Sequence, residues 1–163
     1  NKLSQMKTAI IYLSKHGTTE KVARKIQSLM TNEDVTLINL KSQKHPELTS
    51  FDRIIIGGSV YAGTVSKKLM KFCQIHEPVL SVKELGLFVC GMEPNPDKQL
   101  VELNSAFPES LRSCAKSSGF LGGEFLIDKM NFIEKFIIKK IAHVEKTTSN
   151  IKEEAIELFV KKF

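Results

Sequence analysis

Short apolar, β-branched runs alternate with amphipathic segments along almost the whole chain, and this alternation limits the fold more than any other feature. The runs cover residues 8–13, 35–40, 53–58 and 85–90, and a fifth is expected within 117–127. Parallel neighbouring strands need a crossover connection, which a helix supplies. The alternation therefore predicts a doubly wound α/β domain, a three-layer sandwich around a five-stranded parallel sheet.

The segments between these runs have the spacing of helices with one apolar face. One helix is expected to begin near residues 64–65 and to end at Pro78. The region 98–115 is expected to be helical, with a break near Pro108. The closing helix is expected over 150–162, with an inner side formed by Ile151, Ala155, Leu158 and Phe159.

Length and composition favour one globular domain. The chain has 163 residues, of which 42% are hydrophobic, and this suits a single core over residues 6–163. Residues 1–5 are expected to be a leftover of cloning or a dispensable N-terminal extension. No apolar window approaches the length of a membrane span, so a cytoplasmic protein is expected. The three cysteines are widely spaced without a CxxC pair, and neither a disulfide framework nor a metal site is predicted.

In doubly wound folds, ligands bind beyond the carboxyl ends of the strands. The first strand is followed by a loop rich in hydroxyl groups, made of Ser14, Lys15, His16, Gly17, Thr18 and Thr19. This loop opens a helix, whose first backbone N–H groups have no partner within the helix and attract a phosphate. Walker A and GxGxxG patterns are absent, which disfavours an ATPase or a nicotinamide dehydrogenase of those types. The alternative is that Thr18 or Thr19 only caps the helix.

Two further strand ends carry candidate binding residues. The second is a glycine-rich loop of Ser59, Val60, Tyr61, Ala62 and Gly63, and the third consists of Cys90, Gly91, Met92 and Glu93. The ring of Tyr61 either stacks on a flat ligand or covers the end of the sheet. Glu93 and Asp97 either act on a substrate proton or are ordinary loop carboxylates.

Three segments together carry a resemblance to a known family. The loop SKHGTT resembles the phosphate-binding loop of the flavodoxins, T/S-x-T-G-x-T, with matches at Ser14, Gly17 and Thr19 and a departure at His16. The segment 55–72 is similar to the flavin-side loop and helix of a flavodoxin subgroup that includes menaquinone-dependent protoporphyrinogen IX dehydrogenases. The segment 119–141 resembles the F-x-G-G strand and basic, aromatic helix of that subgroup.

The resemblance implies a flavodoxin-like fold and an FMN cofactor. It places the phosphate on the first loop and the isoalloxazine ring between the second and third loops, with Tyr61 as its stacking partner. The third loop has no aromatic residue to match the second flanking tyrosine of many flavodoxins. One face of the flavin is therefore expected to be open or to contact Met92.

Charge bears on the partner. The chain has 24 Lys plus Arg against 18 Asp plus Glu, a net charge of +6, whereas electron-carrying flavodoxins are typically acidic. Lysines alternate with large apolar residues over 129–141, which suits an anionic membrane surface, where a quinone is available, or the carboxylates of a porphyrin. The alternative is a core helix with a solvated basic rim. No motif supports a nucleic-acid partner.

These observations leave three hypotheses for function. The first is an FMN-dependent oxidoreductase that resembles protoporphyrinogen IX dehydrogenase and passes reducing equivalents from a small-molecule substrate to a quinone, at the inner face of the membrane. The second is a flavodoxin-type shuttle that carries electrons between redox partner proteins. The third is a domain without cofactor that serves in protein interaction. The sequence fixes neither the catalytic residues nor the oligomeric state.

Overall fold

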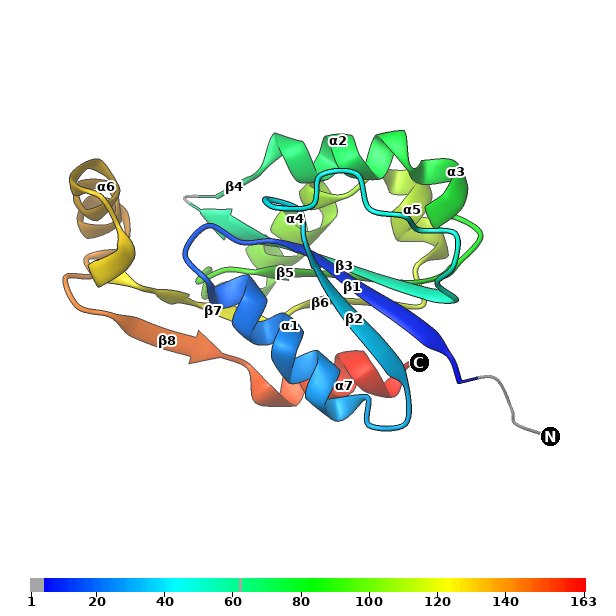
Figure 1. Cartoon of the computed structure of the whole chain (residues 1–163). Coiled ribbons are helices and arrows are strands. Elements are labelled where there is room, and N and C mark those ends of the chain that lie inside the picture. Colours follow the sequence, from blue (N-terminus) through cyan, green and yellow to red (C-terminus); the bar gives the residue numbers. More distant parts are fainter. Residues whose placement is uncertain (1–4, 62) are drawn as a thin grey trace.

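The computed structural model describes residues 5–61 and 63–163, and it confirms the doubly wound fold. Five strands form one sheet in the order β2-β1-β3-β5-β6, and every neighbouring pair in this order is parallel. The strands are β1 (Lys7–Leu13), β2 (Asp34–Asn39), β3 (Arg53–Tyr61), β5 (Glu84–Cys90) and β6 (Ser117–Phe120). Their carboxyl ends lie at the left in Figure 1, on the opposite side from the N-terminus.

Helices cover both faces of the sheet, so that the molecule has three layers (Figure 1). Below the sheet in this view lie α1 (Thr18–Leu29) and α7 (Glu153–Lys161). Above it lie α2 (Lys67–Ile75), α3 (Glu77–Leu80), α4 (Pro96–Ala106) and α5 (Glu109–Cys114). The break between α4 and α5 falls at Phe107 and Pro108, as predicted.

The hydrophobic core is divided by the sheet. Successive side chains of a strand point to opposite faces, and covering both faces requires continuous apolar strands. Ile10 and Phe88 accordingly pack with α1 and α7, whereas Ile11 and Leu87 pack with the helices of the other layer. This two-sided burial explains why the strands were recognisable as uninterrupted apolar runs.

The segment after residue 58 differs from the prediction of an open loop. Strand β3 continues to Tyr61 and turns back into β4 (Thr64–Val65), which pairs with it in antiparallel fashion. The following helix begins at Lys67 rather than near 64–65, because the Ser66 side chain caps it by accepting from the backbone N–H of Lys68. The helix α2 ends at Ile75, and Pro78 lies inside α3 instead of terminating α2.

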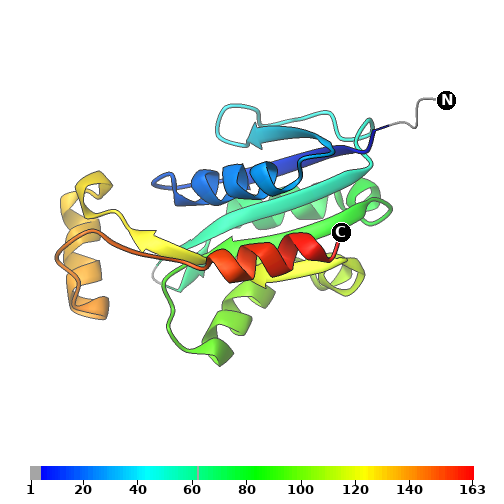
Figure 2. The same ribbon diagram turned by 90° about the horizontal axis from the view of Figure 1, so that it is seen from below.

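The predicted fifth strand is divided into two. After β6 the chain enters β7 (Gly122–Phe125), which leaves the main sheet and pairs with β8 (Thr148–Ile151). This two-stranded arm carries η1 (Ile127–Lys129) and α6 (Phe132–Ala142). Figures 1 and 2 both show α6 standing apart from the three layers, beyond the carboxyl ends of the strands.

The last helix is shorter than predicted and buries a different face. Residues 150–151 belong to β8, and α7 begins at Glu153. Ile156 and Phe159 form its buried face, whereas Leu158, expected inside, is 62% exposed. None of the helices within the described residues has the length and apolar character needed to cross a bilayer.

Candidate functional site

Residues from the three predicted strand-end loops meet at the carboxyl edge of the sheet. A small cavity of about 50 Å³ lies between them. Its lining includes Ser14, Lys15, His16, Thr18, Ser59, Val60, Tyr61, Cys90, Gly91 and Met92. The arm adds Gly123, Glu124, Phe125 and Met130. The structure thus brings together segments that lie far apart in the sequence, as the rule for parallel sheets predicts.

A larger cavity of about 590 Å³ adjoins the small one and shares Val60, Met92 and Phe125 with it. Gly63 and Glu93 of the predicted site lie on its wall. The inner side of α6 closes it with Ile138, Ile141 and Ala142. Its volume falls within the range of about 300–1,000 Å³ typical of small-molecule sites. Of the remaining predicted residues, Gly17 and Thr19 line neither cavity, and Ala62 lies outside the described residues.

The first loop opens helix α1 through a glycine in the left-handed conformation. Gly17 is the N-cap residue of α1 and has φ of 102°, a left-handed conformation that glycine adopts without strain. Its backbone N–H donates to Ser14 Oγ over 2.9 Å, which folds the loop back toward the strand. Neither Thr18 nor Thr19 provides a side-chain cap for α1, so the capping alternative is wrong.

Thr19 is fully buried, and its hydroxyl oxygen has no hydrogen-bond partner among the described residues other than the thiol of Cys90. A thiol is a weak partner, so a ligand whose acceptor oxygen reached this hydroxyl would make a stronger hydrogen bond. This hydroxyl lies in the loop that the sequence assigns to a phosphate. The residues of the first loop therefore fit a phosphate-bearing ligand.

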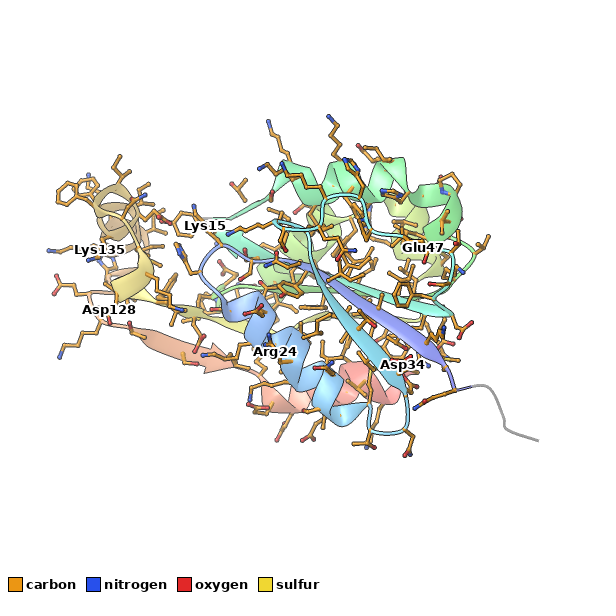
Figure 3. The ribbon with its side chains drawn as sticks, in the orientation of Figure 1. Lys15, Arg24, Asp34, Glu47, Asp128 and Lys135 are labelled. Atoms are coloured by element: carbon orange, nitrogen blue, oxygen red, sulfur yellow. The ribbon has the colours of Figure 1, made fainter. Side chains whose placement is uncertain are left out.

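Two carboxylates that sequence reasoning missed contact the first loop. Glu134 Oε2 lies 2.8 Å from His16 Nε2 and 3.3 Å from Lys15 Nζ. Burial by itself would raise the pKa of Glu134, but the hydrogen bonds from His16, the Asn131 backbone and Lys15 outweigh it and hold the pKa below its ordinary value. Figure 3 shows Lys15 extending from the loop after β1 toward the α6 segment.

The second carboxylate is Glu124 of β7. Its Oε1 accepts from Thr18 Oγ1 over 3.1 Å, and Lys21 Nζ lies 2.9 and 3.0 Å from its two oxygens. The spacing of Asn131 and Glu134 predicts the capping box that the structure contains. It does not indicate that Glu134 pairs with His16, 118 positions away in the sequence. No local sequence pattern indicates the contacts of Glu124.

Tyr61 links the second loop to the first loop and to α6. Its hydroxyl donates to the backbone oxygen of Glu134 over 3.2 Å, and the Lys15 ammonium lies 4.1 Å from its ring centroid. Burial, followed by the charge of Glu134, raises the pKa of Tyr61. One face of the ring is therefore engaged by Lys15, and the hydroxyl holds α6.

The third loop is apolar at its base and acidic at its rim. Burial raises the pKa of Cys90 to about 12, so its thiol stays protonated and is not a nucleophile. Glu93 and Glu102 line the larger cavity, and Oε2 of Glu102 is buried without a partner among the described residues. Burial and the nearby Glu93 raise the pKa of Glu102. Asp97 lies in the first turn of α4, where its N–H donates to Asn95 Oδ1.

A family model described as a flavodoxin domain matches residues 9–152. The chain belongs to the flavodoxin domain family. No curated protein sequence matches it. Among solved structures, a short-chain flavodoxin associated with a non-canonical PDU bacterial microcompartment is 14% identical with a TM-score of 0.56, covering 97% of this chain and 94% of that one. Oxidised flavodoxin 1 from Bacillus cereus is 15% identical with a TM-score of 0.54, covering 95% and 92%.

Flavodoxin 2 from Bacillus cereus is 21% identical with a TM-score of 0.52, and the match covers 71% of this chain and 82% of that one. At these identities the solved structures establish the flavodoxin-like fold. The membership of the family and the position of the loops agree with the resemblance found in the sequence. No comparison points to the protoporphyrinogen dehydrogenase subgroup.

Proposed function

We propose that this chain is an FMN-binding redox protein. The observation that carries the proposal is the convergence of three strand-end loops of a flavodoxin domain on one pair of adjoining cavities. The loops come from the edge where doubly wound folds bind their ligands. When bound, a flavin supplies hydride and single-electron chemistry, and the protein sets its orientation and potential.

Each part of the site has a distinct role in this proposal. Ser14, Gly17 and Thr19, with the first backbone amides of α1, would hold the phosphate group. Val60, Met92 and Phe125 supply apolar walls that suit an aromatic ring system and exclude water. Without a ligand, Tyr61 keeps α6 against the site through its hydroxyl.

Titration of the purified protein with FMN and with riboflavin tests the proposal. We expect FMN to bind with quenched flavin fluorescence and a flavin band near about 450 nm. Riboflavin lacks the phosphate, so it should bind more weakly, by about tenfold or more, if the first loop recognises a phosphate. A protein that binds neither flavin would contradict the proposal and favour the domain without cofactor.

The finer proposal is an oxidoreductase that takes reducing equivalents from a small molecule and resembles protoporphyrinogen IX dehydrogenase. It is supported by the larger cavity, which opens beside the third loop and leaves room for a substrate, and by the surface of α6 described next. Anaerobic addition of protoporphyrinogen IX to the FMN-loaded protein should bleach the flavin. A flavodoxin-type shuttle would stay yellow under the same conditions and exchange electrons only with redox partner proteins.

The exposed side of α6 supports a proposal for the electron acceptor. Phe132, Ile133 and Phe136 are exposed by 85%, 68% and 55%. Lys129, Lys135, Lys139 and Lys140 lie near them in the sequence. This helix is therefore not the core helix that the sequence left open. A basic helix with exposed aromatic residues suits the surface of an anionic bilayer, where a quinone is available.

A further inference from the structure

We propose that Glu134 competes with the ligand's phosphate group for the first loop, so that phosphate binding and the release of α6 from the loop are one coupled event. The ligand is a phosphate monoester or inorganic phosphate. The inference rests on the proposed function in taking the first loop as the phosphate site. It adds that the carboxylate of Glu134 occupies that site when no ligand is bound.

The contacts of Glu134 fall on two side chains of the first loop that can donate hydrogen bonds to a phosphate. Its Oε2 lies between His16 Nε2 at 2.8 Å and Lys15 Nζ at 3.3 Å. Both side chains belong to the loop Ser14–Thr19, and both can donate an N–H to an anion. The side chains of Glu134 and His16 are 12% and 16% exposed, so water screens their contact weakly, whereas Lys15 is 48% exposed and its contact is screened more.

Charge makes simultaneous occupation unfavourable. A phosphate monoester carries close to two negative charges at neutral pH, and Glu134 remains ionised because its pKa is lowered. Like charges a few ångströms apart repel strongly at a partly buried site. Glu124 at the same loop is compensated by Lys21, so Glu134 is the carboxylate that repels the phosphate. The phosphate can be accommodated only when the carboxylate of Glu134 withdraws.

The helix is built to move as a unit. The N-terminal cap of α6 is internal to it, because Asn131 Oδ1 accepts from the Glu134 N–H over 2.8 Å and Glu134 Oε1 accepts from the Asn131 N–H over 3.3 Å. Breaking the contacts of Oε2 with the loop therefore leaves the capping box in place. The arm β7–β8 that carries α6 lies outside the main sheet. Release of α6 also breaks the hydrogen bond from the Tyr61 hydroxyl to the backbone oxygen of Glu134, but it leaves the backbone pairing of the five parallel strands in place.

Glu134→Gln removes the charge and keeps the side-chain size, and Glu145→Gln is the matched control. Glu145 is an exposed carboxylate after α6 that pairs with Lys139 at 3.0 Å. We expect Glu134→Gln to bind FMN and inorganic phosphate about tenfold more tightly than the native chain, with riboflavin affinity unchanged. Glu145→Gln should change none of the three affinities. An unchanged ratio of FMN to riboflavin affinity in Glu134→Gln would overturn the inference.

Hydrogen exchange of the native chain gives a readout that needs no substitution. Addition of inorganic phosphate should speed the exchange of the α6 amides while it slows that of the first turn of α1. Unchanged or slower exchange in α6 upon phosphate binding contradicts the inference, as does failure of the loop to bind phosphate. If phosphate binds with this response but neither flavin binds, the coupling stands and the FMN proposal fails.

Discussion

The backbones of Gly91 and Gly123 touch where β5 ends and β7 begins. A Cβ atom placed on Gly123 would lie 2.7 Å from the carbonyl oxygen and 2.9 Å from the nitrogen of Gly91. The Gly91 N–H also donates to the carbonyl oxygen of Gly122 over 3.0 Å. This contact attaches the arm that carries α6 directly to the third loop of the candidate site.

Gly123→Ala should therefore destabilise the arm, because backbone atoms cannot yield as a flexible side chain can. We expect the free energy of unfolding to fall by about 1–3 kcal/mol in a denaturant titration. Gly119→Ala is a suitable comparison, since the nearest atom to its new methyl group is the end of the Leu121 side chain at 3.1 Å. Equal losses in the two variants would show that the contact between Gly91 and Gly123 is not tight.

Thr19→Val should have opposite effects on stability and on ligand binding. The substitution removes a buried hydroxyl whose one partner among the described residues is the weakly bonding thiol of Cys90, so the ligand-free protein should gain up to about 1 kcal/mol in the free energy of unfolding. FMN affinity should drop by about tenfold or more, because a hydrogen bond to a charged group is lost, and riboflavin affinity should not change. Thr36→Val, at an exposed position of β2, controls for the substitution itself. A loss of stability in Thr19→Val would indicate that the hydroxyl has a stronger partner.

Glu102→Gln should stabilise the protein at neutral pH. Because the pKa of Glu102 is raised in the folded state, the folded chain binds this proton more tightly than the unfolded chain does. The free energy of unfolding therefore falls as the pH rises from the ordinary value of 4.5 through the raised pKa. Glutamine avoids this loss. Because Glu102 is partly exposed and solvent screens the effect, we expect a gain of no more than about 0.5–1 kcal/mol at neutral pH, which disappears below the ordinary pKa.

Thermal unfolding over a pH series measures this difference. Glu157→Gln, on the exposed side of α7, controls for the removal of one negative charge from the chain. A gain of the same size at all pH values would mean that desolvation and the charge of Glu93 do not govern Glu102. Equal gains in Glu102→Gln and Glu157→Gln would point to net charge as the cause.

The sequence was sufficient to predict the strands that are buried on both faces of the sheet. Strands such as 53–58 and 85–90 are buried on both faces, and this requirement produces apolar runs that cannot be mistaken for loops. Once the sheet is known to be parallel, topology alone brings Ser14, Tyr61 and Met92 to one edge. The main lines of the candidate site thus followed from the order of elements.

The parts that the sequence missed depend on contacts between distant segments. Strand β8 consists of mostly exposed residues, Thr148–Ile151, and has no apolar alternation by which it could be recognised. The pairing of His16 with Glu134 depends on where the arm places α6. Leu158 was predicted to be buried because Ile151 was taken as part of the same helix and its apolar face. Ile151 belongs to β8 and α7 begins at Glu153, so the buried face of α7 is a different one.

The exposed apolar side of α6 leads to a prediction about membranes. Phe132 and Phe136 are one helical turn apart, so both rings can enter a bilayer surface together. In Figure 3, Lys135 extends from α6 away from the three layers, where it can approach lipid phosphates. The helix therefore offers both of the attractions that hold amphipathic helices at anionic membranes, apolar insertion and charge.

We expect the native chain to sediment with vesicles that contain phosphatidylglycerol and to remain in solution with vesicles of phosphatidylcholine alone. The double variant Phe132→Ser/Phe136→Ser should bind the anionic vesicles at least about tenfold more weakly, since partial insertion of a phenylalanine ring contributes on the order of 1 kcal/mol or more. Leu158→Ser provides the matched control, because Leu158 is 62% exposed but lies on α7 below the sheet. High salt should weaken the binding of the native chain, because each lysine near an anionic surface contributes about 1 kcal/mol at low ionic strength. Equal binding to both kinds of vesicle, or an equal loss in Leu158→Ser, would exclude α6 as a membrane-binding element.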